Sequence, residues 1–78
     1  MKTDRARRPR PFTTTYFRSG KVRLFAHACT SMGAAKAATQ RLLTGEFDSA
    51  EIYTNQGNYV ASVTRERNQV TIRVSRKF

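Results

Sequence analysis

The chain has 78 residues and a mass of 8.9 kDa, and its 15 Lys and Arg against five Asp and Glu give a formal net charge of +10. This length predicts one small domain, with little room for the buried pocket that most enzymes need. No apolar run approaches the ~18 residues of a membrane span, and no secretory signal is visible. The single cysteine, Cys29, excludes an internal disulfide and a cysteine-built zinc site and fits a reducing compartment.

The first 11 residues are predicted to be a flexible basic arm. They carry five Arg or Lys side chains, one Asp and both prolines, and they lack apolar periodicity. We expect the arginines of this arm to contact phosphate groups, with a solubilising tail as the alternative. These arginines are Arg5, Arg7, Arg8 and Arg10. Residues 12–78 are predicted to form a single domain.

The first part of that domain has the pattern of a β-hairpin. Residues 12–18 and 21–29 are rich in Thr, aromatic and β-branched residues, and a Ser-Gly pair separates them. A two-residue turn pairs Phe17 with Val22 and points both toward the core. On this register Tyr16 faces the opposite side.

A helix follows the hairpin. Residues 32–44 have helical periodicity with an alanine-rich stripe, and Thr30 and Ser31 offer a hydroxyl N-cap. Gly45 is predicted to end the helix. The small side chains of the stripe suit a helix that packs closely on a sheet.

Three strands complete the predicted fold. Residues 50–55 and 58–64 form a hairpin around a Gln-Gly turn, and a four-residue loop leads into a last strand over residues 69–76. In the last strand Val70, Ile72 and Val74 are predicted to face the core. The expected fold class is α+β, a five-stranded antiparallel sheet with one helix on one face in the order ββαβββ. A single helix covers only one face, so the other face stays open or binds a partner.

Aromatic and basic side chains alternate on the face that is predicted to be open. Arginine binds phosphate and flat rings stack on unpaired bases, but the same mixture occurs at protein interfaces. Ordinary cross-strand packing of the rings is a third interpretation. The face is predicted to carry Tyr16, Arg18, Lys21, Arg23, Phe25, His27, Tyr53, Val60, Thr71 and Arg73. The residues expected to bind a protein or nucleic-acid partner are Tyr16, Arg18, Lys21, Arg23, Phe25, Tyr53, Arg65, Arg67 and Arg73.

No constellation of residues points to catalysis. His27 has no triad partner, and Cys29 at the start of the helix is expected to be a semi-buried thiol. The acids Glu46, Asp48 and Glu51 are not spaced as a metal-binding loop. We therefore expect no enzymatic activity, no cofactor, no metal and no small-molecule substrate.

Two stretches, residues 28–36 and 52–61, resemble small phage-encoded anti-CRISPR proteins, in particular a ββαβββ inhibitor of the type I-F surveillance complex. The resemblance, together with the element order, covers roughly residues 13–74. The first stretch enters the helix and the second crosses the second hairpin. The matching residues are Ala28, Thr30, Ser31, Met32, Ala35 and Lys36, then Ile52, Thr54, Gly57, Tyr59 and Ala61.

This resemblance implies a stoichiometric inhibitor that acts in the host bacterial cytoplasm. Such a protein binds the RNA-guided surveillance complex on the backbone subunits that line the guide RNA, and it blocks target DNA binding. Many anti-CRISPR proteins are acidic DNA mimics, whereas a chain at +10 would contact guide RNA, target DNA or acidic protein patches. The alternative function is a free-standing DNA- or RNA-binding module of a phage or plasmid. Neither function involves a membrane.

Overall fold

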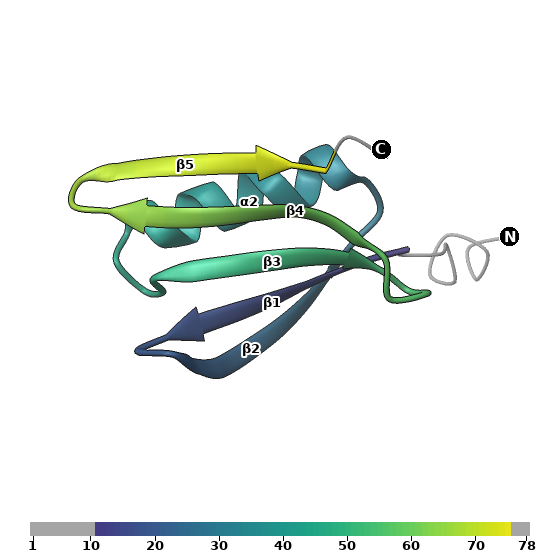
Figure 1. Cartoon of the computed structure of the whole chain (residues 1–78), viewed down its shortest axis with the longest axis horizontal. Helices are drawn as coiled ribbons and strands as arrows, with labels where there is room; N and C mark the ends of the chain where they lie inside the picture. The colour runs from purple at the N-terminus through teal and green to yellow at the C-terminus, as the bar shows by residue number, and fades with distance from the viewer. Residues whose placement is uncertain (1–10, 76–78) are drawn as a thin grey trace, which may run out of the picture.

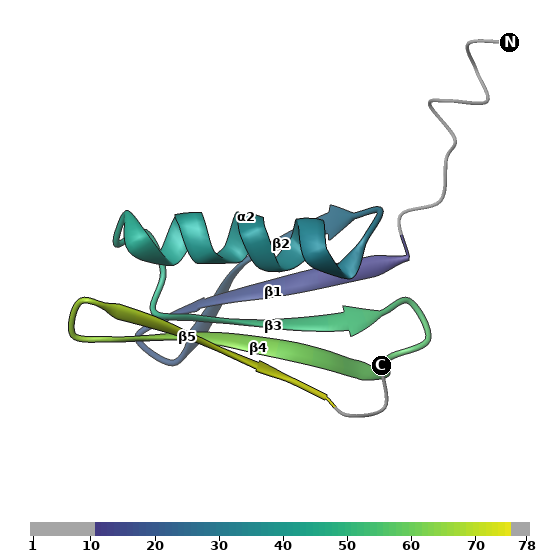
Figure 2. The same ribbon diagram turned by 90° about the horizontal axis from the view of Figure 1, so that it is seen from above.

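The computed structural model describes residues 11–75, and its elements follow the order ββαβββ. They are strands β1 (Phe12–Arg18) and β2 (Lys21–Ala28), helix α2 (Ser31–Leu43), and strands β3 (Ser49–Thr54), β4 (Tyr59–Glu66) and β5 (Gln69–Val74). The five strands form one antiparallel sheet in the order β2-β1-β3-β4-β5. The helix lies along one face of this sheet, as Figures 1 and 2 show. The predicted α+β fold class is confirmed.

Helix α2 is bounded by the capping groups that the sequence indicates. The Thr30 hydroxyl oxygen accepts a hydrogen bond from the Gly33 N–H at 2.9 Å, which satisfies one of the free donors of the first turn. At the other end Gly45 has a positive φ of 85° and its N–H donates to the Leu42 carbonyl. Glycine adopts this left-handed conformation without strain, so the helix ends there.

The helix packs on the sheet through small side chains. Ala34, Ala38 and Leu42 recur at four-residue spacing and are all buried. Two clusters form the core below them. One cluster holds Tyr16, Ala38, Leu42, Ala50 and Val63, and the other holds Ala34, Ile52, Val60 and Ala61. Because alanine has no side chain beyond Cβ, the helix backbone approaches the sheet closely.

A β-bulge in the first hairpin decides which side chains face the helix. Phe17 pairs with Val22 as predicted, but the register then shifts so that Tyr16 pairs with Leu24 and Arg23 is the extra residue. Tyr16 is only 1% exposed and belongs to the core. The prediction that Tyr16 faces away from the core was therefore wrong. The bulge lets Tyr16 and Leu24 face the helix together, and Phe17 and Val22 point to the opposite face.

A second bulge acts in the same way in the next hairpin. Ile52 pairs with Ala61 on the expected register, but beyond them Tyr53 pairs with Tyr59 and Val60 is the extra residue. Val60 is 2% exposed and packs in the core on the helix side. Its predicted place on the open face was wrong, because the bulge turns it toward α2.

The last hairpin is tighter than expected. Strand β4 continues to Glu66, so the turn to β5 contains two residues instead of four, and Arg67 in this turn has a positive φ of 58°. Strand β5 ends at Val74, two residues before the predicted end. Val70 packs against the core, but Ile72 and Val74 are 44% and 63% exposed because β5 is an edge strand of the sheet.

Replacing Tyr16 by alanine tests its place in the core. We expect Tyr16→Ala to lower the free energy of unfolding by about 3–5 kcal/mol, the cost of removing a large buried ring. In the control Phe25→Ala, which removes a ring that is 61% exposed, the change should stay near 0.5 kcal/mol. Urea unfolding followed by circular dichroism measures both. Equal losses in the two variants would contradict the assigned faces.

Candidate partner-binding surface

The sheet face opposite α2 is uncovered by any described element, and we call it the open face. Cross-strand pairing places side chains of all five strands on it. They are Thr13, Thr15, Phe17, Val22, Phe25, His27, Ser49, Glu51, Tyr53, Tyr59, Ser62, Thr64, Glu66, Gln69, Thr71 and Arg73. Hydroxyl and aromatic groups dominate this set. Its charged side chains are Glu51, Glu66 and Arg73, so the open face carries few charges and is nearly neutral.

Two tyrosines form a fixed aromatic pair on this face. The rings of Tyr53 and Tyr59 meet edge to face, with centroids 5.8 Å apart and an interplanar angle of 68°. The Tyr53 hydroxyl donates to Glu51 Oε1 at 3.1 Å, and the Tyr59 hydroxyl donates to Ser62 Oγ at 2.9 Å. Each ring is therefore held at its tip as well as by its neighbour.

The hydrogen bond to Glu51 perturbs the titration of Tyr53. Because the neutral phenol donates to the carboxylate, and a phenolate would lose this bond and face a negative charge, the pKa of Tyr53 is raised above 10.0. Burial and the neighbouring Tyr59 act in the same direction. Tyr53 therefore stays neutral at physiological pH and can donate a hydrogen bond.

A further exposed aromatic group is on the outer strand of the same face. Phe25 is 61% exposed on β2 and pairs with Thr15 of β1. Next to it, His27 Nδ1 lies 3.2 Å from the Thr13 hydroxyl oxygen. The predicted placement of Phe25, Tyr53 and Arg73 on the open face is confirmed. Exposed apolar area of this kind is typical of a contact surface.

The basic residues of the first hairpin lie elsewhere. Arg18 and Arg23 line a cleft of about 420 Å³ together with Glu46 and Phe47. This cleft is on the helix side of the sheet, because the Phe47 ring packs against buried Tyr16 with centroids 4.9 Å apart. The prediction that these arginines belong to the open face was wrong. The bulge at Arg23 and the alternation along β1 turn them to the other side, and Lys21 pairs with Arg18 at the end of the hairpin.

Arg65 has a structural partner. One of its terminal nitrogens lies 3.2 Å from Asp48 Oδ1, and the other oxygen of that carboxylate accepts a hydrogen bond from the Ser19 N–H at 2.8 Å. Asp48 thus ties the β1–β2 turn to β4. Arg67 occupies the nearby β4–β5 turn. Together with Arg18, these groups form a mixed-charge patch at the hairpin end of the sheet, and they do not line the open face.

The most basic segments of the sequence are attached at the other end of the sheet, away from this mixed-charge patch. Strand β1 begins and β5 ends at the same end of the sheet (Figure 1), where the Pro11 carbonyl accepts from Asn55 N–H and Ser75 N–H donates to Val60. Residues 1–10 and 76–78, which lie outside the described part, hold six of the ten excess positive charges. Four of these charges belong to the predicted arm side chains Arg5, Arg7, Arg8 and Arg10. Pro11 and Ser75, to which these segments are joined, therefore lie at the end of the sheet that holds the Tyr53–Tyr59 pair.

The described residues hold no group of three or more His, Cys, Asp and Glu side chains that could bind a metal. Cys29 is exposed, which corrects the expectation of a semi-buried thiol. Within residues 11–75 no helix has the length and apolar character needed to cross a membrane.

Searches against protein-family models, curated proteins and solved structures found no match to this chain. The two stretches that resemble anti-CRISPR proteins remain a prediction. In the fold, residues 28–36 hold the N-cap and first turns of α2, and residues 52–61 hold the β3–β4 hairpin with its bulge. The second stretch therefore includes both rings of the aromatic pair.

Sequence reasoning missed Tyr59 and Phe17 as open-face residues. Both depend on bulges, which a strict period of two cannot locate. The sequence of β1 offered no clear signal, because Thr13, Thr14 and Thr15 are identical although only Thr14 is buried.

Removing the carboxylate of Glu51 should lower the pKa of Tyr53. In Glu51→Ala the phenol loses its acceptor and the nearby negative charge, so its pKa should fall toward 10.0. The control Glu66→Ala removes a carboxylate at the far end of β4 and should leave Tyr53 unchanged. NMR titration of tyrosine ring carbons measures both. An unchanged Tyr53 pKa in Glu51→Ala would show that the 3.1 Å hydrogen bond is absent in solution.

Proposed function

We propose that this protein is a non-enzymatic anti-CRISPR inhibitor. It binds a type I RNA-guided surveillance complex in the cytoplasm of the bacterial host and blocks target DNA binding. The observation that supports this most is the arrangement of charge: a nearly neutral, aromatic open face lies beside the point where both strongly basic chain ends are attached. Such a surface suits a partner made of protein and nucleic acid together.

The open face fits protein better than phosphate. Its rings are held by hydrogen bonds and by each other, so binding costs little side-chain entropy. Aromatic groups surrounded by hydroxyls and depleted in charge are typical of the centre of protein interfaces. A surface that binds phosphates alone needs rows of Arg and Lys, and this face carries one basic side chain, Arg73, with the acidic Glu51 and Glu66.

The basic ends fit the nucleic acid of the same partner. A fully extended chain spans at most about 3.3–3.6 Å per residue, so an arm of ten residues can reach phosphates well beyond the sheet. Contact with guide RNA or with incoming DNA would add affinity that falls with salt. The resemblance of residues 28–36 and 52–61 to anti-CRISPR proteins supports the surveillance complex as this ribonucleoprotein.

A free-standing DNA- or RNA-binding module is the second candidate. The observation that favours it is the same concentration of six excess positive charges in residues 1–10 and 76–78. In that case the aromatic pair would stack on unpaired bases instead of packing on protein.

Substitutions on the open face test the proposed function. We expect the purified protein to co-elute with a type I surveillance complex in size-exclusion chromatography at physiological salt. Tyr53→Ala and Phe25→Ala should each weaken this binding about 30-fold, as for central aromatic groups of an interface. Leu43→Ala is the matched control, because this apolar side chain is 59% exposed on the helix and should change binding less than twofold.

Bare nucleic acid separates the two candidates. The inhibitor should show weak retention of free DNA or RNA and defined stoichiometry with the complex. Strong retention of bare DNA or RNA, with no co-elution with any type I complex, would contradict the inhibitor and support the second candidate.

A further inference from the structure

The two edges of the sheet differ in how they are protected. Strand β2, at one edge, contains the bulge at Arg23 and also carries Lys21, two features that hinder further strand pairing. Strand β5, at the other edge, pairs with β4 without a register shift. Its one charged side chain, Arg73, lies on the open face. Strand β5 is therefore an unprotected edge with backbone groups available to another strand.

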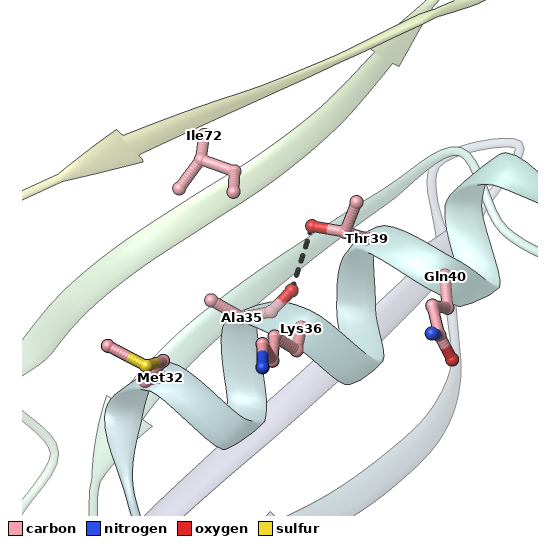
Figure 3. A pocket seen from close by; sticks show the side chains of 6 residues that line it. All are labelled: Met32, Ala35, Lys36, Thr39, Gln40 and Ile72. Atoms are coloured by element: carbon pink, nitrogen blue, oxygen red, sulfur yellow. Dashed lines mark hydrogen bonds between the residues drawn. The ribbon is translucent and has the colours of Figure 1, made fainter.

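An apolar groove runs beside this edge on the helix side. Its volume is about 440 Å³, and Ile72 extends from β5 toward Met32, Ala35 and Thr39 of α2 (Figure 3). Lys36 and Gln40 complete the lining on the helix. The groove exists because Ala35 is too short to fill the space between the helix and the edge strand.

Large apolar side chains in and beside the groove are open to solvent. Met32 is 70% exposed, Ile72 44% and Val74 63%. The helix-side positions of β5 alternate with its open-face positions, so an added strand would present every second side chain to this groove. We propose that the edge of β5 and this groove bind an extended segment of a partner protein as a sixth strand, with apolar residues alternating with acidic residues.

Charge selects this occupant over a second copy of the chain. The lining of the groove includes Lys36 and no acidic residue. Arg73 lies on the other face of β5, and Arg76 and Lys77 follow the strand in the sequence. A second copy would bring the same basic groups and a further charge of +10 to the same edge. An acidic segment brings complementary charge, with its apolar residues beside Ile72 and its carboxylates beside Arg73.

This site consists of the β5 edge and the groove on the helix side and shares only Arg73 with the open face, so it does not depend on the surveillance complex as the partner. Addition of a strand supplies affinity through backbone hydrogen bonds, and the alternate side chains supply specificity. The open face and the β5 edge would then contact different parts of a partner.

A synthetic peptide with the sequence Glu-Val-Glu-Ile-Asp-Val-Glu, blocked at both ends, tests the proposal with the full-length protein. We expect NMR titration to shift the resonances of β5 and of Met32, and to slow exchange of the amide hydrogens that β5 points away from β4. A peptide with lysine in place of every acid is the control for charge and should bind at least tenfold more weakly.

Two matched variants locate the site on the protein. Ile72→Glu places a negative charge in the groove, of the same sign as the charges of the peptide, and should weaken peptide binding at least tenfold. Val22→Glu changes a side chain of similar exposure on the opposite edge strand and should alter binding less than twofold. Far-UV circular dichroism of both variants should match the parent protein.

Three results would overturn the proposal. The first is an unchanged affinity of Ile72→Glu for the peptide, and the second is a peptide that shifts only open-face resonances. The third is a dimer of the protein alone in analytical ultracentrifugation that Ile72→Glu dissociates, because it would show that a second copy occupies the edge.

Discussion

The close packing of α2 on one face of the sheet is the contact on which the rest of this structure depends. Ala34 and Ala38 bring the helix backbone near the strands, and Tyr16 fills the space beside Leu42. Arg41 lies over the Tyr16 ring at 5.2 Å from its centroid, and burial raises the pKa of this phenol. The described residues 11–75 cover one face of the sheet well and leave the other without a covering element.

Element order and helix ends could be predicted from the sequence, because they follow from local chemistry. A hydroxyl at Thr30 and a glycine at position 45 specify the helix ends without reference to the rest of the fold. The faces of the strands could not be predicted fully. One extra residue at Arg23 and one at Val60 change the pairing of every residue beyond them. The position of each bulge depends on which side chains pack in the core, here Tyr16, Leu24 and Val60, and this is set by the whole fold.

The distribution of charge likewise depends on topology. The sequence gives a net charge of +10, but only the sheet order shows that its two most basic segments are attached at one end. The residues between them hold eight basic and four acidic side chains, and several of these, such as Arg65 with Asp48, stabilise the fold. Under the proposed function, the nearly neutral face would contact protein and the basic ends would contact nucleic acid of the same ribonucleoprotein.

The salt dependence of binding to a type I surveillance complex tests this division of tasks most directly. Full-length protein and a variant that begins at residue 11 should be compared by titration between low and moderate salt. We predict that the affinity of the full chain falls steeply with salt. The shortened chain should bind more weakly but still with defined stoichiometry, and its affinity should fall less steeply. The reason is that each phosphate contact adds about 0.7–0.9 to the slope of log affinity against log salt concentration. Identical slopes for the two proteins, or complete loss of binding with the arm, would contradict the account.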